Sequence, residues 1–146
     1  MTEETTVWVH GCNFVIDSIP TVGSTYRSIT SGLQISSTPT QAVNISVMVA
    51  IPTPSVLLGN PIVATTVLLK FKTSNAEIYH VGAVDGASYL TISVPDPLTS
   101  TSFTGYESLM INPPKTIQCG MALEFGITVK PSGYIQLLGA GTEFQS

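Results

Sequence analysis

The sequence predicts an all-β fold, an antiparallel β-sandwich or jelly roll of about eight or nine strands in a single domain over residues 1–146. Three observations lead to this prediction. Short runs rich in Val, Ile and Thr recur along the chain, and β-branched side chains suit a pleated surface. Gly, Pro, Asn and Asp turn signals separate these runs at spacings typical of sandwiches and barrels. No window keeps a helical period.

The N-terminal segment Thr5–Ile16 reads as a strand with alternating faces, in which Trp8 and His10 share one face. We expect Gly11 to form a bulge within it. The polar stretch Asp17–Gln41 predicts a long loop with one short strand near residues 33–35.

The central part of the chain predicts four strands. Val43–Ile51 alternates apolar and polar residues over much of its length and predicts a half-buried strand. The runs Ile62–Phe71, Glu77–Val84 and Tyr89–Val94 predict an antiparallel meander. Turns at Thr-Ser-Asn and at Asp-Gly would connect the three, since Gly accepts positive φ.

The C-terminal part predicts three more strands. Gly105–Ile111 is followed by Asn-Pro-Pro, which we expect to end that strand. Cys119–Val129 predicts a strand with a bulge at Gly126, and Tyr134–Leu138 would pair back onto it after a Pro-Ser-Gly turn. Gly139–Gly141 reads as a flexible break.

Composition excludes several classes of partner. The chain holds only five Lys and Arg residues, too few for a basic surface that neutralises phosphates, so we expect no nucleic-acid partner. No apolar run is long enough to span a bilayer. The acidic start of the chain lacks the basic region of a signal peptide, which favours a cytoplasmic location. We therefore expect Cys12 and Cys119 to be reduced and buried; the alternative is a disulfide between them.

Five short motifs resemble, in their order, those of an uncharacterised family of small bacterial all-β proteins. The resemblance implies a compact β-fold and no particular reaction, because that family has no established activity. The motifs are Trp8-Val9-His10-Gly11, Ile51-Pro52-Thr53-Pro54, Leu69-Lys70-Phe71-Lys72, Glu77-Ile78 and Val84-Asp85-Gly86.

No catalytic or metal-binding motif is present, so we predict no enzyme activity, no cofactor and no metal. His10, His80 and Asp85 would form a metal or acid–base cluster only if the fold brought them together. The simpler interpretation of His10 is that it faces a polar loop or bonds a backbone carbonyl. Glu124 lies among apolar residues: it is either solvated, or buried with a raised pKa.

Aromatic residues suggest a binding surface. Exposed Trp and Tyr combine a flat apolar face with a hydrogen-bonding group, as glycan and peptide contacts require; the alternative is that most of them pack in or over the core. Our candidate ligand-binding residues are Trp8, His10, Tyr79, His80 and Asp85. The wider aromatic set is Trp8, Tyr26, Tyr79, Tyr89, Tyr106 and Tyr134.

Three functional hypotheses follow. The first is a non-catalytic binding or interaction module, carbohydrate-binding or oligomer-forming, whose partner is a glycan, a peptide or a small hydrophobic ligand. The second is a cyclase- or isomerase-like β-barrel or sandwich that encloses a hydrophobic molecule, with His10, His80 or Glu124 as acid–base group. The third is a structural or assembly protein. The positive mean hydropathy predicts a homo-oligomer, in which an interface covers apolar surface.

Overall fold

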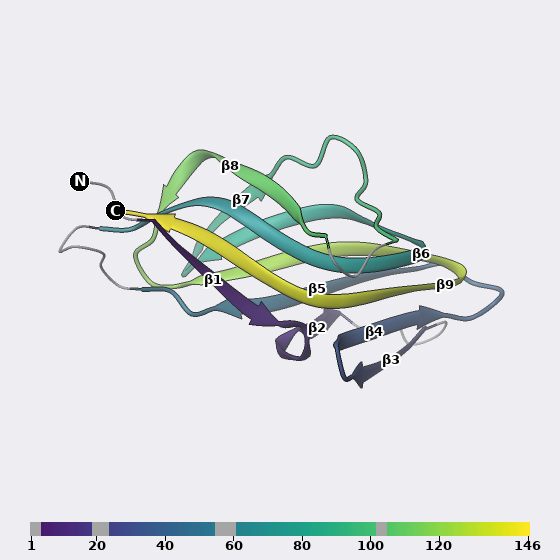
Figure 1. The fold of residues 1–146 in the computed structure, drawn as a ribbon. Coiled ribbons are helices and arrows are strands. Elements are labelled where there is room, and N and C mark those ends of the chain that lie inside the picture. Colours follow the sequence, from purple (N-terminus) through teal and green to yellow (C-terminus); the bar gives the residue numbers. More distant parts are fainter. Residues whose placement is uncertain (1–3, 19–23, 55–60, 102–104) are drawn as a thin grey trace.

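The computed structural model describes residues 4–18, 24–54, 61–101 and 105–146. Within these ranges, nine antiparallel strands form one sheet that folds over into two layers (Figure 1). The prediction of an all-β antiparallel sandwich is therefore confirmed. The strands are β1 Glu4–His10, β2 Val15–Ser18, β3 Ser24–Ile29, β4 Gly32–Ser37, β5 Val43–Ile51, β6 Val63–Asp85, β7 Ser88–Ile92, β8 Glu107–Thr116 and β9 Met121–Gln145, with a 3₁₀ turn η1 at Gly11–Asn13.

Two long strands, β6 and β9, form the centre of the fold. They have 23 and 25 residues and pair along almost their whole length, from Val63 opposite Gln145 to Val84 opposite Ala122. At about 3.3 Å per residue, a straight strand of this length would extend about 80 Å. Instead both strands bend at one end of the molecule, so that each contributes one half to each layer (Figure 1).

The bends are built from residues with left-handed backbone. Asn75 in β6 has φ 51° and Ser132 in β9 has φ 60°, a region that few non-glycine residues enter and that Asn tolerates best. The Asn75 side-chain amide donates a hydrogen bond to the Pro131 carbonyl oxygen at 3.0 Å. This bond ties the two bends together, so the strands change layer at the same place.

The two layers share β6 and β9 and differ in the flanking strands. In the first layer, β1 and β4 pair with the C-terminal half of β9, β3 extends β4, and β8 pairs with the N-terminal half of β6. In the second layer, β5 pairs with the N-terminal half of β9, β2 extends β5, and β7 pairs with the C-terminal half of β6.

The hydrophobic core lies between the layers. β5 alternates between buried and more exposed residues, which confirms the half-buried strand predicted over Val43–Ile51. Phe14, just after η1, packs on Phe125 of β9 with ring centroids 5.8 Å apart. The largest fully buried side chains are Phe71, Phe125, Phe144, Ile35, Ile62, Leu69, Ile78, Ile111, Leu123, Ile127, Ile135 and Leu137.

The predicted central meander is wrong in one part and confirmed in another. The runs 62–71 and 77–84 are not neighbouring strands, because the Thr-Ser-Asn signal between them bends β6 into the other layer instead of reversing it. The hairpin at Asp-Gly is confirmed: Asp85 lies opposite Ser88, and Gly86 has φ 59°.

Three C-terminal predictions are also wrong. Residues 134–138 do not pair back onto 119–129, because both segments pair with β6 instead. Gly139–Gly141 is buried strand inside β9 and not a flexible break. β8 continues through its Asn-Pro-Pro to Thr116. Among the described strands it pairs with β6 alone, with a register shift between Ala64 and Thr66. Pro is tolerated on such an edge strand.

The N-terminal third also departs from expectation. The stretch predicted as a loop over Asp17–Gln41 contains a hairpin of β3 and β4, while residues 19–23 lie outside the described residues. Gly11 begins η1 and does not form a bulge within a continuous strand. A Cβ at Gly11 would clash with the carbonyl oxygen of Leu137, so only glycine fits where η1 passes this close to β9.

Cys12 and Cys119 are free, as predicted, but both are exposed, so the prediction of buried thiols is wrong. No helix in the described part of the chain is long and apolar enough to cross a membrane.

Candidate functional site

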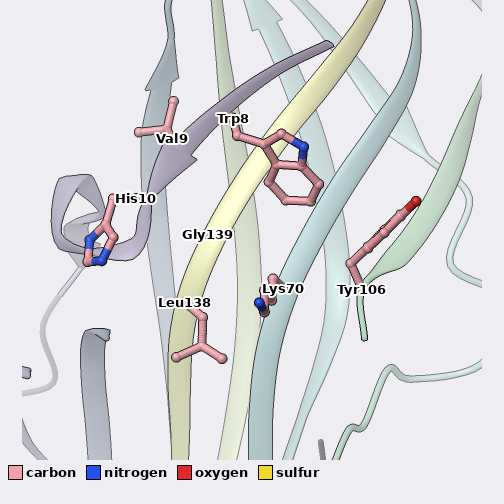
Figure 2. A pocket seen from close by; sticks show the side chains of 7 residues that line it. All are labelled: Trp8, Val9, His10, Lys70, Tyr106, Leu138 and Gly139. Atoms are coloured by element: carbon pink, nitrogen blue, oxygen red, sulfur yellow. The ribbon is translucent and has the colours of Figure 1, made fainter. Parts of the chain in front are cut away.

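An open groove of about 390 Å³ lies on the outer face of the first layer. It crosses β1, β9 and β6 and ends beside the start of β8 (Figure 2). We call it the aromatic groove. It is lined by Trp8, Val9, His10, Lys70, Tyr106, Leu138 and Gly139.

Strand register brings these residues together. Trp8 lies opposite Gly141, which lies opposite Leu68 on β6; His10 lies opposite Gly139, which lies opposite Lys70. Residues directly opposite each other share a face of the sheet. Two adjacent rows therefore cross the outer face, each with a glycine in its middle.

The glycines leave the middle of the groove without side chains. A Cβ at Gly141 would lie 2.5 Å from the Val7 carbonyl oxygen and 3.1 Å from Cδ2 of the Trp8 indole. The indole therefore lies over the backbone of β9, as Figure 2 shows. Gly141 thus creates the space that Trp8 occupies.

Trp8 and Tyr106 form the aromatic wall of the groove. Their ring centroids are 5.5 Å apart with an interplanar angle of 78°, an edge-to-face arrangement that aromatic pairs favour. Trp8 is 45% exposed and Tyr106 61% exposed. The contact holds both rings in place while leaving much of their area open to a ligand.

Two polar side chains line the same groove. His10 Nδ1 accepts a hydrogen bond from the Cys12 N–H at 3.1 Å. That bond sets the neutral tautomer with the proton on Nε2, which can donate to a ligand. Lys70 rises from β6 between Leu138 and Tyr106 (Figure 2) and supplies an ammonium group.

A second group of aromatic residues lies on the outer face of the second layer; we call it the tyrosine surface, made of Tyr79, His80, Tyr89 and Glu124. His80 Nε2 and the Tyr89 hydroxyl share a 2.5 Å hydrogen bond, and their rings stack with an interplanar angle of 3°. Burial, and after it the negative charge of Glu124, raise the pKa of Tyr89 above 10.0.

Asp85 has a structural role. It is 6% exposed, and its carboxylate accepts hydrogen bonds from the backbone N–H groups of residues 118, 119 and 120 at 2.9, 2.8 and 3.2 Å. Burial alone raises the pKa of this carboxyl, but the bonds from Cys119, Gln118 and Gly120 and the charge of Lys115 outweigh it, so the pKa is lowered below 3.8. Asp85 therefore fixes the segment before β9.

The structure divides the five predicted site residues among three places. Trp8 and His10 meet in the aromatic groove, Tyr79 and His80 lie together on the tyrosine surface, and Asp85 lies at the hairpin. The hypothetical cluster of His10, His80 and Asp85 is not formed, because the two His lie on different layers. No group of three His, Cys, Asp or Glu side chains in the described ranges is placed to hold a metal ion.

The alternative interpretation was that most of the aromatic residues pack in or over the core, and exposure excludes burial in the core for five of the six. Tyr26, Tyr79, Tyr89 and Tyr106 are exposed, as is Trp8. Glu124 is half-buried, with Ser46 Oγ at 3.5 Å from its carboxylate. These Trp and Tyr rings are therefore on the surface, whereas aliphatic side chains and Phe fill the core.

Five lining residues lie outside the predicted site, and Tyr106 was named only in the wider aromatic set. They are Val9, Lys70, Tyr106, Leu138 and Gly139. The Gly-x-Gly spacing at 139–141 was a usable signal, because period-two glycines leave one face of a strand bare. Nothing local indicated that this bare face lies between Trp8 and Lys70.

No protein-family profile and no curated protein sequence matches the chain. Solved structures do match. A mutant of a family 29 carbohydrate-binding module superposes with a TM-score of 0.52 at 6% identity, over 98% of this chain and 92% of that chain. A family 29 module from Piromyces equi gives a TM-score of 0.45 at 13% identity, over 97% and 91% of the two chains. The first likeness shows a common β-sandwich fold.

Proposed function

We propose that this protein is a non-catalytic carbohydrate-binding module and that it binds a glycan in the aromatic groove. The observation that carries the proposal is the pair of exposed rings, Trp8 and Tyr106, held edge to face, with the Trp8 indole over the glycine backbone of β9. The similarity in fold to a carbohydrate-binding module supports it.

The groove suits the chemistry of a sugar. A pyranose ring has an apolar face of C–H groups, which can stack on an indole, and a rim of hydroxyls, which need hydrogen-bond partners. Trp8 supplies the flat surface, while His10 Nε2–H and Lys70 supply donors at its edge. An open groove also admits a chain of several sugars, which a closed pocket would exclude.

The enclosed-ligand hypothesis has less support. Its acid–base residues were His10, His80 and Glu124. His10 is exposed on the outer face of the first layer, and the other two lie on the tyrosine surface. None of the three lies in the core between the layers, so the described residues offer no enclosed site for that chemistry.

A glycan array probed with the wild-type protein and a Trp8→Ala variant tests the proposal. We expect binding to a defined set of glycans and a loss of about tenfold or more in affinity for Trp8→Ala, as for truncation of a central aromatic contact. Tyr26→Ala is the matched control, because Tyr26 is 54% exposed on β3, outside the groove.

Circular dichroism must show that both variants are folded. Glycan binding that Trp8→Ala leaves unchanged would move the site away from the groove. Binding to a peptide library that depends on Trp8, with no glycan bound, would replace the glycan by a peptide as partner.

A further inference from the structure

We propose that the aromatic groove selects an acidic glycan, a chain containing uronate sugars, whose carboxylate pairs with Lys70. This inference rests on the proposed function, because it concerns which glycan the same groove binds. It is carried by the position of one lysine among the lining residues and by the charges around it.

Lys70 lies in the same row across the sheet as His10 and Gly139. Gly139 has no side chain to cover the lysine on the side facing β1, and the neighbouring row carries Trp8 on the same face. A ligand stacked on the indole therefore has the ammonium group at its edge. Among the described residues that line the groove, Lys70 is the only lysine or arginine.

No carboxylate is among the described residues that line the groove. On the same outer face, Glu143 lies in the row of Thr66, four residues along β6 from Lys70. This corresponds to about 13 Å, beyond the screening length of about 8–10 Å in physiological salt. Glu107 lies opposite the core residue Leu69, so strand alternation directs it away from Lys70's face.

The composition of the whole chain makes a lysine in the groove unusual. It has a net charge of −4 and only five Lys and Arg residues. A cation beside two exposed rings, with no acid lining the same groove, is complementary to a ligand that combines a flat apolar ring with a negative charge. A uronate has both features, because its carboxylate projects from the rim of a pyranose whose C–H face can still stack.

Backbone geometry allows both contacts at once. Trp8 on β1 and Lys70 on β6 are separated by β9 and lie one row apart, so their backbones are about 12 Å apart. The indole covers part of this distance from one side and the lysine side chain reaches in from the other. One sugar ring fits between them with its carboxylate toward Nζ.

The experiment compares two probes that differ only at C6, tetra-β-1,4-glucuronate and cellotetraose, by isothermal titration calorimetry. At low salt, we expect the wild-type protein to bind the acidic probe about fivefold more tightly, since a partly exposed charge-assisted contact contributes about 1 kcal/mol. High salt should remove most of this preference and leave cellotetraose binding almost unchanged.

Lys70→Gln should abolish the preference for the acidic probe while retaining cellotetraose binding, and Lys70→Arg should restore it. Lys130→Gln is the matched control: it removes the same charge at an exposed position near the bend of β9, so the preference should persist.

Equal binding of both probes, or a preference that survives Lys70→Gln, would overturn the inference. If Trp8→Ala still weakened binding of the probes, the groove would remain a glycan site. The proposed function would then stand without the preference for an acidic glycan. Failure of both probes would also overturn the inference, and the glycan array would then decide the proposed function separately.

Discussion

Asp85 offers the sharpest test of how the fold is held together. In Asp85→Asn, the amide oxygen can keep the two bonds that Oδ1 now accepts, from the N–H groups of Cys119 and Gly120. The amide nitrogen then faces the Gln118 N–H, from which Oδ2 of the aspartate accepts a hydrogen bond at 2.9 Å. Two donors face each other, so one buried N–H loses its partner.

The expected cost follows from these contacts. An orphaned buried N–H costs about 1–3 kcal/mol, and the two remaining bonds lose the strength that a charged acceptor gives them. Removal of a charge from a buried site offsets part of this loss. We therefore expect Asp85→Asn to lower the free energy of unfolding by about 2–3 kcal/mol at neutral pH, or the Tm by about 6–10 °C for a chain of this size.

The sign of the pH dependence provides a second readout. Because the pKa of Asp85 is lowered in the folded protein, the unfolded chain binds a proton first as the pH falls. The stabilisation by the carboxylate is therefore complete above its unfolded pKa of about 3.9 and is lost as the pH falls through the folded pKa. The difference in the free energy of unfolding between wild type and Asp85→Asn should therefore shrink as the pH falls over that range.

Urea unfolding at neutral and acidic pH, followed by circular dichroism, measures both quantities. Asp96→Asn is the control, since Asp96 is exposed. If Asp85→Asn stayed within about 0.5 kcal/mol of wild type at neutral pH, the carboxylate would not be the anchor described above. A gap independent of pH would refute the linkage argument.

Three other perturbations follow from the structure. Thr142 is fully buried and its hydroxyl has no hydrogen-bond partner, so Thr142→Val should raise the free energy of unfolding by about 1 kcal/mol in urea titrations, and a loss of stability would contradict this. Gly141→Ala should lower the free energy of unfolding by about 1–3 kcal/mol and shift the tryptophan fluorescence. Gly105→Ala is the control and should be nearly neutral, because a Cβ there meets nothing within 4 Å. Equal effects of the two substitutions would refute the packing argument. Glu124→Gln should lower the pKa of Tyr89, because one cause of its elevation is removed; ultraviolet titration checks this, and an unchanged pKa would exclude the charge effect.

The strands could largely be predicted from local sequence, whereas their arrangement could not. Val43–Ile51 alternates clearly enough to define its buried face, and Asp85-Gly86 forms the expected hairpin. Asn75 and Ser132 occur in equally good turn signals, yet they bend strands between layers. Turn-forming residues of this kind allow either a hairpin, which reverses the chain, or a bend within one strand. Which of the two forms depends on how distant segments pair.

The candidate site shows the same division. Trp8 and His10 were predicted together, because alternation along one strand places them on one face. Lys70 was missed, and Tyr106 was named only in the wider aromatic set, since their positions beside Trp8 depend on how β6 and β8 align with β9 and β1. Membership in the resembled bacterial family stays a prediction, as does the homo-oligomer, which light scattering can check.

The position of β9 constrains how the protein can assemble. Four other strands, β1, β4, β5 and β6, all hydrogen-bond to it, although it comes last in this sequence. During synthesis, those strands leave the ribosome before the partner they need, with apolar residues still uncovered. The sandwich therefore cannot be completed until the 25 residues of β9 have been synthesised. Until then the unfinished chain must stay soluble by itself or be held by chaperones.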